Sequence, residues 1–559
     1  MMRKLILLLV LSPFLGAQNN PAECYEFPRD AVEQIRADIA YLASDELMGR
    51  KPGTDGDLMS REYILKQFKQ NNLRPYFKTG FLQEFSVPNR VDRSADGNYF
   101  MYKGEQLKID EDFYPIQLSS NGSFKGETEY VEFGIESKEL DRDDIDDEDV
   151  KGAIAVMELS SPDGIHPHSK FKDWHDLSKR IKLLKKKGAK AVILIHTEGN
   201  TNSPKSEFKT TDPIGIPVIY VNDEDYAKKL RRSREVSLAV SLNAIEDVTY
   251  NVGAMLDNGQ EKTIIIGAHY DHLGMGGEGS RYAGEEPMVH NGADDNASGT
   301  AGMLALARHL STTKDSTMRR FNYLFFAFSG EEMGLLGSKY LVAKAKSREN
   351  NWHYMLNMDM IGRMEDETLA INGIGTSPMW EQIILPLECG LTLETTESGV
   401  GPSDHTSFYY ADIPVLHFFT GTHPDYHKPS DDFEKINIEG VQITLAVICG
   451  IIRNTPQSAD FPFSTTKVES TKAPQFSVTL GVMPDYLYSG GGMKIDGVSP
   501  GKPAAKAGLK AGDIITQLGE VQVSDMQTYM QGLAQFKKGD KATLLYRRDG
   551  EVKQAEIQF

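Results

Sequence analysis

Long apolar runs without polar alternation dominate the stretch from about Val248 to Pro456. TIIIGAHYD, NYLFFAFSGEE, YMLNMDMIG and IPVLHFF are runs of this kind. Strands with such a sequence are typically buried on both faces, as they are in parallel sheets. Segments with apolar residues at helical spacing, such as SGTAGMLALARHL, lie between the runs. This region is therefore predicted to be an α/β domain in which parallel strands alternate with helices.

The flanking segments follow other patterns. From Ala31 to about Pro75 the apolar spacing is helical, with a break at the turn-rich stretch SDELMGRKPGTDGDL. Further on, the runs AIAVMEL, AVILIH and IPVIYVN surround the basic helix KRIKLLKKKGAK, which predicts a smaller α/β unit. The C-terminal stretch predicts short strands and one helix.

These patterns divide the chain into successive segments. A length of 559 residues is too great for one ordinary hydrophobic core, so several domains are expected. We predict a first part of the main α/β domain at 25–121, an inserted α/β unit at 122–242 and the rest of the main domain at 243–457. A linker at 458–474 and a β-rich domain at 475–559 follow.

The N-terminus has the layout of a secretory signal peptide. MMRKLILLLVLSPFLGA has a basic start, a short apolar run and a small-residue exit, so cleavage is expected after Ala17 and residues 1–17 are predicted to be removed. The apolar run is too short for a stable membrane anchor. We expect export to the periplasm or the extracellular space; an N-terminal anchor that stays attached is the alternative.

Charge and cysteine content narrow the function classes. The formal net charge of -19 argues against a nucleic-acid partner, which would require a basic surface. The three cysteines, Cys24, Cys389 and Cys449, allow one disulfide, and their spacing does not decide the pair. Because the chain has no CxxC pair, a bound metal would have to use His, Asp and Glu side chains.

Acidic and imidazole side chains gather where the apolar runs of the main α/β domain end. They are His269 and Asp271, Asp294 and Asp295, Glu331 and Glu332, Asp359, and His427. The carboxyl ends of parallel strands lie at one edge of a sheet, so these side chains are expected to meet in one crevice. Buried carboxylates without counter-charges are costly. Their convergence predicts divalent cations, with zinc as the first choice.

Two of these pairs suggest separate roles for their members. His269 and Asp271 are two residues apart in a strand and share a face, so the carboxylate of Asp271 can accept the free ring N–H of the histidine. Glu331 and Glu332 lie at a turn and can point in different directions. One can then bind a metal while the other takes a proton from water. Four further histidines are interpreted as structural or surface residues: His272, His290, His405 and His423.

At this point the chain resembles the co-catalytic zinc exopeptidases, a family that includes secreted leucyl aminopeptidases and glutamate carboxypeptidases. The motifs AHYDH, GADDNASG, SGEEMGLLGS, NMDMIG and YHKPSDD occur in the order typical of that family. The resemblance implies an α/β fold with a mixed, mostly parallel sheet and helices on both faces. It also implies two Zn²⁺ ions per subunit.

Carried over by position, the resemblance assigns five metal ligands. His269 and Asp359 would hold one zinc ion, Glu332 and His427 the other, and Asp295 would bridge the two.

Asp295 is preferred to Asp294 as the bridge because the family's bridging aspartate lies four residues before the final glycine of its motif, here Gly299. The family often has a cis peptide bond after this aspartate, which here would be Asp295-Asn296.

The resemblance also implies the catalytic roles. Glu331 corresponds to the general base, Asp271 to the residue that orients His269, and Tyr426 to a tyrosine that stabilises the oxyanion. The expected activity is removal of residues from the N-terminus of peptides. A dipeptidase or carboxypeptidase of the same chemistry is the alternative enzyme, and a metal-free scaffold like the transferrin-receptor ectodomain is the alternative without activity.

The flanking domains also resemble known modules. The stretch at 122–242 is similar to a protease-associated (PA) domain. The stretch at 475–559 resembles a PDZ domain through DGVSPGKPAAKAGLKAGDIITQLGEVQV. The expected partners are therefore peptide substrates and, at the PDZ domain, the C-terminus of a peptide.

Overall fold

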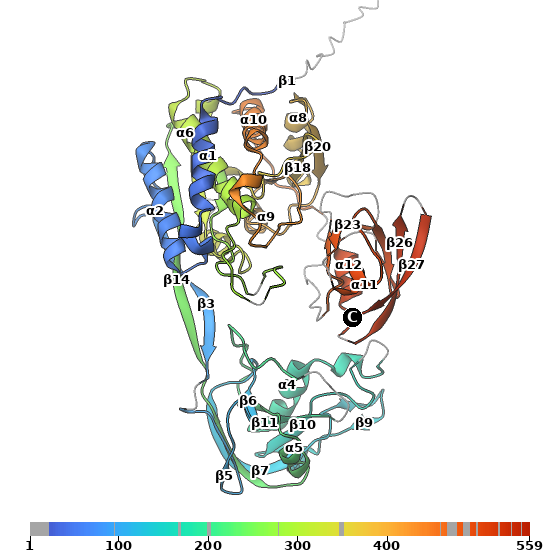
Figure 1. The fold of residues 1–559 in the computed structure, drawn as a ribbon. Helices are drawn as coiled ribbons and strands as arrows, with labels where there is room; N and C mark the ends of the chain where they lie inside the picture. The colour runs from blue at the N-terminus through green and yellow to red at the C-terminus, as the bar shows by residue number, and fades with distance from the viewer. Residues whose placement is uncertain are drawn as a thin grey trace, which may run out of the picture. The chain divides into compact units, whose positions relative to one another are not determined.

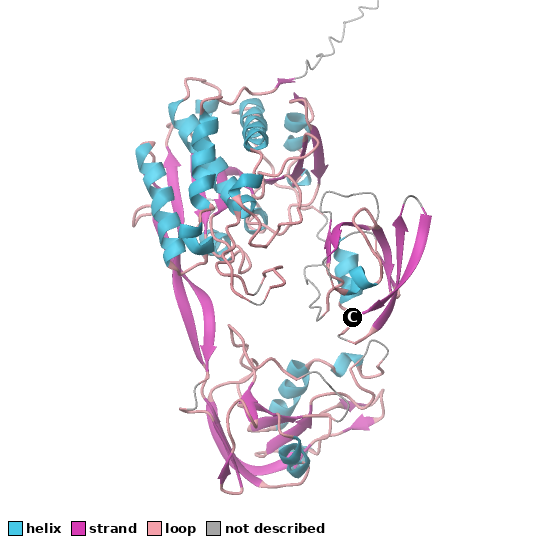
Figure 2. Cartoon of the chain, viewed as in Figure 1, coloured by secondary structure: helices cyan, strands magenta, loops and turns pink. Residues whose placement is uncertain are grey.

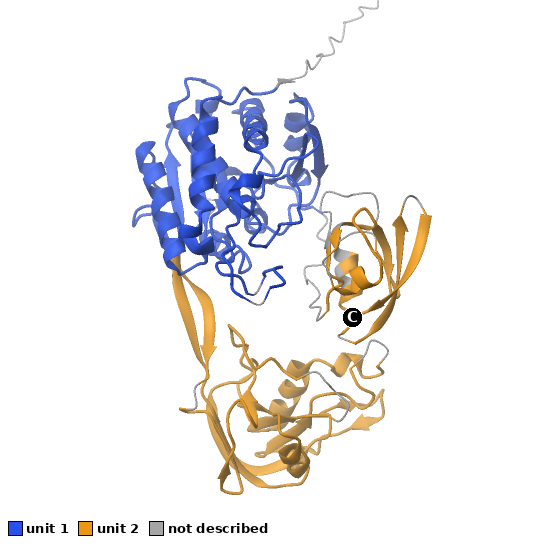
Figure 3. Cartoon of the chain, viewed as in Figure 1, with its two compact units in different colours: residues 1–83, 250–469 blue, residues 84–249, 470–559 orange. Residues whose placement is uncertain are grey.

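The computed structural model describes residues 22–559 except for 94–95, 166–168, 198–202, 278, 285, 346–350, 459, 467–477, 485–491, 499–500, 524–525, 538 and 549–550. The predicted signal peptide and part of the predicted linker lie outside the described residues. The chain separates into two compact units, Met1–Gln83 with Tyr250–Glu469 and Glu84–Thr249 with Ser470–Phe559 (Figure 3).

A mixed sheet forms the centre of the first unit (Figure 1). Four parallel strands lie at its middle, in the order β16 (Asn322–Phe328), β15 (Thr263–His269), β17 (Trp352–Met358) and β21 (Val415–Phe419). On one side β14 (Asn243–Leu256) runs antiparallel to β16 and pairs with β2 (Arg74–Pro75) and β3 (Leu82–Asp92). On the other side follow β18 (Thr368–Asn372), antiparallel to β21, and β20 (Thr392–Thr396). The predicted mixed, mostly parallel sheet is confirmed.

The central strands are apolar throughout because each face of the sheet is covered. In β15, Ile264 and Ile266 belong to one buried core and Ile265 to another, as expected for side chains that alternate between the faces. The larger core includes residues of α1 (Ala31–Leu42), α2 (Asp55–Gln70), α6 (Gly299–Thr312), α8 (Met379–Ile384) and α10 (Ile438–Asn454). The smaller core includes residues of α7 (Leu336–Lys344) and α9 (His405–Tyr409). Helices on both faces, shown in cyan in Figure 2, are thus confirmed.

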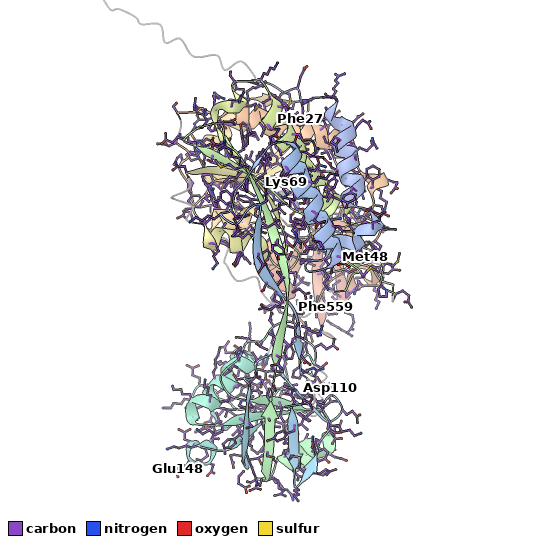
Figure 4. All side chains as sticks on the ribbon, turned by 90° about the vertical axis from the view of Figure 1, so that its left-hand side faces the viewer. Phe27, Met48, Lys69, Asp110, Glu148 and Phe559 are labelled. Atoms are coloured by element: carbon purple, nitrogen blue, oxygen red, sulfur yellow. A yellow bond between two sulfur atoms is a disulfide. The ribbon has the colours of Figure 1, made fainter. Side chains whose placement is uncertain are left out.

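The turn-rich break between α1 and α2 forms a tight corner. A short 3-10 helix (Asp45–Arg50) ends in three residues with left-handed backbone, of which Met48 is labelled in Figure 4. A Cβ atom on Gly49, in the middle of this corner, would come within 2.5 Å of the backbone oxygens of Gly274 and His290. Only glycine therefore allows the corner to approach the loops of the sheet so closely.

A disulfide fastens the start of the described chain to the first unit. Cys24 is bonded to Cys389, next to the short parallel pairing of β1 (Ala22–Glu23) with β19 (Leu387–Glu388). Cys449 is buried in α10 with a free thiol. The structure thereby decides the pairing that the cysteine spacing leaves open.

The inserted unit contains an eight-stranded sheet. The strand order is β5 (Glu105–Gln106), β4 (Tyr99–Tyr102), β13 (Glu235–Val240), β7 (Gly122–Tyr130), β10 (Ile154–Glu158), β11 (Ala191–Ile195), β12 (Val218–Val221) and β6 (Phe113–Pro115). The basic helix α4 (Leu177–Lys187) buries Ile181 and Leu184 on this sheet and ends at Gly188, which has a φ of 107°. Helix α5 (Glu224–Leu230) contributes Ala227 and Leu230 to a second core.

The C-terminal part forms its own sheet with two short helices. Its strands are β22 (Val482–Pro484), β23 (Met493–Val498), β24 (Ile514–Leu518), β25 (Val521–Gln522), β26 (Lys541–Arg548) and β27 (Glu551–Gln558). The helices are α11 (Pro503–Lys506) and α12 (Met526–Leu533). Among the described residues, no helix combines the length and the apolar character needed to cross a membrane.

Candidate metal centre

All five predicted ligand side chains lie at the carboxyl edge of the parallel strands. His269 is the last residue of β15 and Asp359 follows β17 directly. Glu332 comes shortly after β16, and His427 lies on the loop after β21. Asp295 belongs to a kinked turn (Ala293–Ser298) that leads into α6, and its own backbone angles are not helical.

These side chains form two groups that share Asp295. In the first, His269 Nε2 lies 3.3 Å from Asp359 Oδ1 and 3.4 Å from Asp295 Oδ1. In the second, His427 Nε2 lies 3.2 Å from Asp295 Oδ2 and 3.2 Å from Glu332 Oε2. Asp295 thus offers one carboxylate oxygen to each group.

The spacing within each group fits a bound cation. Zinc lies about 2.0–2.1 Å from nitrogen and oxygen ligands in tetrahedral sites, so neighbouring ligand atoms are about 3.3 Å apart. Direct hydrogen bonds between a ring nitrogen and a carboxylate are shorter, at about 2.7–2.9 Å. The distances of 3.2–3.4 Å in both groups agree with the first geometry. The nitrogen and oxygen donors also suit zinc.

The two adjacent glutamates have opposite electrostatic surroundings. Burial raises the pKa of Glu331 well above its ordinary value; His269 opposes this shift, and the carboxylates of Asp359 and Glu332 add to it. Burial would also raise the pKa of Glu332, but the nearby imidazoles of His427 and His272 lower it to about 2. Glu332 therefore stays ionised, whereas Glu331 can take up a proton.

Asp271 contacts both His269 and Glu331. His269 Nδ1 lies 3.2 Å from the backbone oxygen of Asp271 and 3.7 Å from its carboxylate Oδ1. The same carboxylate accepts a hydrogen bond of 3.1 Å from the backbone N–H of Glu331. Asp271 thus links the imidazole of one group to the backbone of the neighbouring glutamate.

Glu331 and Tyr426 lie next to the two groups. Glu331 Oε2 is 3.8 Å from His269 Nε2. The ring of Tyr426 stacks on that of His427 with 3.9 Å between centroids, and the guanidinium of Arg281 lies 4.7 Å from the tyrosine ring centre. Gly279, on the same loop as Arg281, accepts a hydrogen bond of 2.8 Å from His427 Nδ1. This loop also lines a cavity of about 480 Å³.

His272 has a contact that the sequence interpretation missed. Its side chain is fully buried, and its ring Nδ1 lies 2.6 Å from Glu332 Oε1. The sequence contained a signal for it, since AHYDH places His272 three residues after His269.

None of the other three histidines interpreted as structural or surface residues is exposed. His290 hydrogen bonds to Ser280, His405 stacks on His417, and His423 Nε2 lies 3.2 Å from Asp294 Oδ2.

Two buried residues support the backbone of the site. Arg50 donates hydrogen bonds to the backbone oxygens of Leu42, Tyr270, Asn291 and Gly292. It thereby joins the N-terminal segment to the end of β15 and to the loop before Asp295.

Asp431, on the loop between β21 and α10, binds the backbone of the same turn. Its Oδ2 accepts hydrogen bonds from the backbone N–H groups of Asp294 and Asp295, at 2.9 and 3.1 Å. The cis peptide bond expected at Asp295-Asn296 is present in this turn.

Three family models match the chain. Residues 251–452 match peptidase family M28, residues 123–228 the PA domain, and residues 468–559 the PDZ domain. Residues 251–452 therefore form a domain of peptidase family M28, accompanied by a PA domain and a PDZ domain, which confirms the resemblance inferred from the motifs.

Several proteins named aminopeptidases are similar to this chain. Aminopeptidase YwaD of Bacillus subtilis is 27% identical over 301 residues, 51% of this chain and 61% of that protein. A probable leucine aminopeptidase of Arthroderma benhamiae is 30% identical over 196 residues, 34% of this chain and 52% of that protein. The chain thus spans 52–61% of the length of these relatives. The solved aminopeptidase from Aneurinibacillus sp. strain AM-1 is 21% identical, with a TM-score of 0.43 over 78% of this chain and 96% of its own.

Proposed function

We propose that the protein is a zinc aminopeptidase that hydrolyses peptides from the N-terminus with two Zn²⁺ ions per subunit. His269, Asp359 and Asp295 would hold one ion, and Glu332, His427 and Asp295 the other. Membership of peptidase family M28 and the similarity to proteins named aminopeptidases support the reaction class.

One observation carries the proposal more than any other. The carboxylate of Asp295 divides its two oxygens between two groups, each with a histidine and a second carboxylate at 3.2–3.4 Å. Without cations, three buried carboxylates would crowd around the two imidazoles of these groups, and the hydrogen bond from His272 relieves only Glu332. This arrangement disfavours the metal-free scaffold, because every ligand position is filled.

In the proposed reaction, Glu331, Asp271 and Tyr426 each have a separate role. When bound, a pair of zinc ions polarises the scissile carbonyl and lowers the pKa of water. Glu331, whose pKa is raised, accepts a proton from the attacking water and delivers it to the nitrogen of the leaving amine. Asp271 keeps His269 and the backbone of Glu331 in place, and the Tyr426 hydroxyl donates a hydrogen bond to the developing oxyanion.

The test is the release of an aromatic amine from matched aminoacyl and N-blocked aminoacyl arylamides. We expect cleavage of the free-amine substrates only, loss of that activity after stringent chelation, and recovery on addition of zinc. Cleavage of N-blocked substrates alone would contradict the aminopeptidase assignment in favour of a carboxypeptidase-like enzyme. Undiminished activity after chelation would contradict a metal centre.

We further propose the cellular context and the domain limits. Residues 1–17 would act as a signal peptide and direct the protein to the periplasm or the extracellular space.

The inserted unit would extend over residues 84–249, because the strands between Tyr99 and Pro115 belong to its sheet. The peptidase domain would then consist of residues 25–83 and 250–457, with the PDZ domain as a candidate site for a peptide C-terminus.

A further inference from the structure

The two carboxylate oxygens of Glu332 face different imidazoles. Oε2 lies 3.2 Å from His427 Nε2, within the group that shares Asp295. Oε1 lies 2.6 Å from His272 Nδ1. The two distances differ by more than half an ångström, so His272 and His427 contact the same carboxylate in different ways.

The shorter distance identifies a direct hydrogen bond. Two ligands of one tetrahedral zinc ion lie about 3.3 Å apart, whereas a charge-assisted hydrogen bond is much shorter. His272, Asp295 and Glu332 also lie close enough together to be considered as a ligand group, with His272 Nδ1 4.0 Å from Asp295 Oδ2. His427 Nε2, however, lies 3.2 Å from both carboxylates, which is the spacing expected around one tetrahedral ion. The distances of 2.6 and 4.0 Å therefore favour His427 as the ligand and His272 as a hydrogen-bond donor to Glu332.

The imidazole of His272 is held rigidly in this position. Its side chain is fully buried, and its backbone N–H donates a hydrogen bond of 3.3 Å to the oxygen of Arg50. One side of the ring lies against Gly292, where an added Cβ would come within 2.6 Å of the ring atoms. A ring fixed in this way can orient a carboxylate with little loss of side-chain entropy.

We propose that His272 is a positioning residue for Glu332. Its Nδ1–H donates to Oε1 and thereby turns Oε2 towards His427 and Asp295, so that Glu332 would bind a cation through Oε2. The inference rests on the proposed metal centre and adds to it a residue that acts through a ligand. Hydrogen bonds to ligating carboxylates commonly change metal affinity by about 10- to 100-fold.

The experiment compares His272→Asn with His272→Leu in the full-length protein. The amide nitrogen of Asn can occupy the place of the ring Nδ1 and keep the donor, whereas Leu removes it. Zinc affinity of the metal-free proteins is measured by competition with a chromophoric chelator, and thermal unfolding without metal checks that each variant is folded. His309→Leu is the matched control, because His309 is a half-buried histidine with a 2.8 Å hydrogen bond to Tyr25 Oη.

We expect His272→Leu to weaken one of two zinc-binding steps by about 10- to 100-fold and to leave the other unchanged. His272→Asn and His309→Leu should both bind zinc within about three-fold of the wild type. If His272→Leu does not fold, His272→Gln, which carries its donor one bond further out, replaces it and should show at least a ten-fold loss relative to His272→Asn.

Two results would overturn the inference alone. Wild-type affinity at both steps in His272→Leu would show that the hydrogen bond does not matter. Equal losses in His272→Asn and His272→Leu would show that the imidazole itself is required. Failure of the wild-type protein to bind zinc at all would instead contradict the proposed function, so the two failures are distinguishable.

Discussion

Glu331 and Glu332 show how adjacent residues of one type acquire different chemistry. Two imidazoles face Glu332 and lower its pKa to about 2, although burial acts in the opposite direction. Glu331 is also buried, and burial together with the carboxylates of Asp359, Glu332 and Asp404 raises its pKa. A raised pKa suits a group that must first accept and then release a proton near neutral pH.

Replacement of Glu331 by Gln tests its role directly. Gln has nearly the same shape but cannot accept the proton, so kcat should fall by about 10²- to 10⁴-fold while zinc content and thermal stability stay close to wild type. Steady-state kinetics and metal analysis provide the measurements. The exposed Glu381→Gln serves as the control and should retain full activity. Near wild-type turnover in Glu331→Gln would exclude Glu331 as the base.

Asp404, a fully buried residue directly before α9, allows the cost of a buried negative charge to be tested by changing the pH. Burial raises its pKa from 3.8 to about 7, so its contribution to stability is complete below pH 3.8 and is lost as the pH rises towards 7. Asp404→Asn remains neutral throughout. In metal-free protein, the Tm of the variant should exceed that of the wild type by at least about 2 °C at pH 8 and by less at pH 5. An equal difference at both pH values would contradict the shifted pKa.

Arg50 is expected to be critical for stability. Its guanidinium donates hydrogen bonds to four buried backbone oxygens. Met has no donor and would leave these oxygens without a partner, so Arg50→Met should lower the free energy of unfolding by at least about 3 kcal/mol. Arg50→Lys should lose less because it keeps the charge. Urea unfolding of the metal-free protein measures both, with the exposed Arg36→Met as a near-neutral control. A stable Arg50→Met variant would be inconsistent with this role.

At the scale of the elements, the strand ends were the most predictable part of the site. Apolar runs that end in His, Asp or Glu identify both the strand and the edge at which its polar residues meet. The contacts of Arg50 could not be predicted, because they join residues more than two hundred positions apart, from the corner after α1 to Tyr270 and Asn291. The hydrogen bond between His272 and Glu332 could not be predicted either, because it depends on the directions in which the two side chains point.

The disulfide is the element-scale feature that is simplest to test. Cys24 and Cys389 are 365 residues apart, so their bond closes a very long loop and restricts the unfolded chain. The double variant Cys24→Ser, Cys389→Ser should lose roughly 2–4 kcal/mol of stability and unfold at a lower temperature. Calorimetry under oxidising conditions measures the change, and the reduced wild type should behave like the variant. Equal stability of oxidised and reduced wild type would contradict a structural role for the bond.

At the scale of the whole molecule, the fold class and the order of domains followed from sequence pattern and motifs. The start of the inserted unit was harder to place, because β4, β5 and β6 are only two to four residues long and lie in a polar stretch. Short strands of this kind gain their stability from neighbours such as β13 and β12, which come more than a hundred residues later.

Two metal ions are proposed to share the carboxylate of Asp295. The most direct test is the zinc content of the purified full-length protein, measured by mass spectrometry after dialysis, for wild type and Asp295→Ala. We expect two zinc ions per chain in the wild type and loss of both in the variant, with the variant still folded. One ion or none in the wild type, or two ions retained without Asp295, would contradict this proposal.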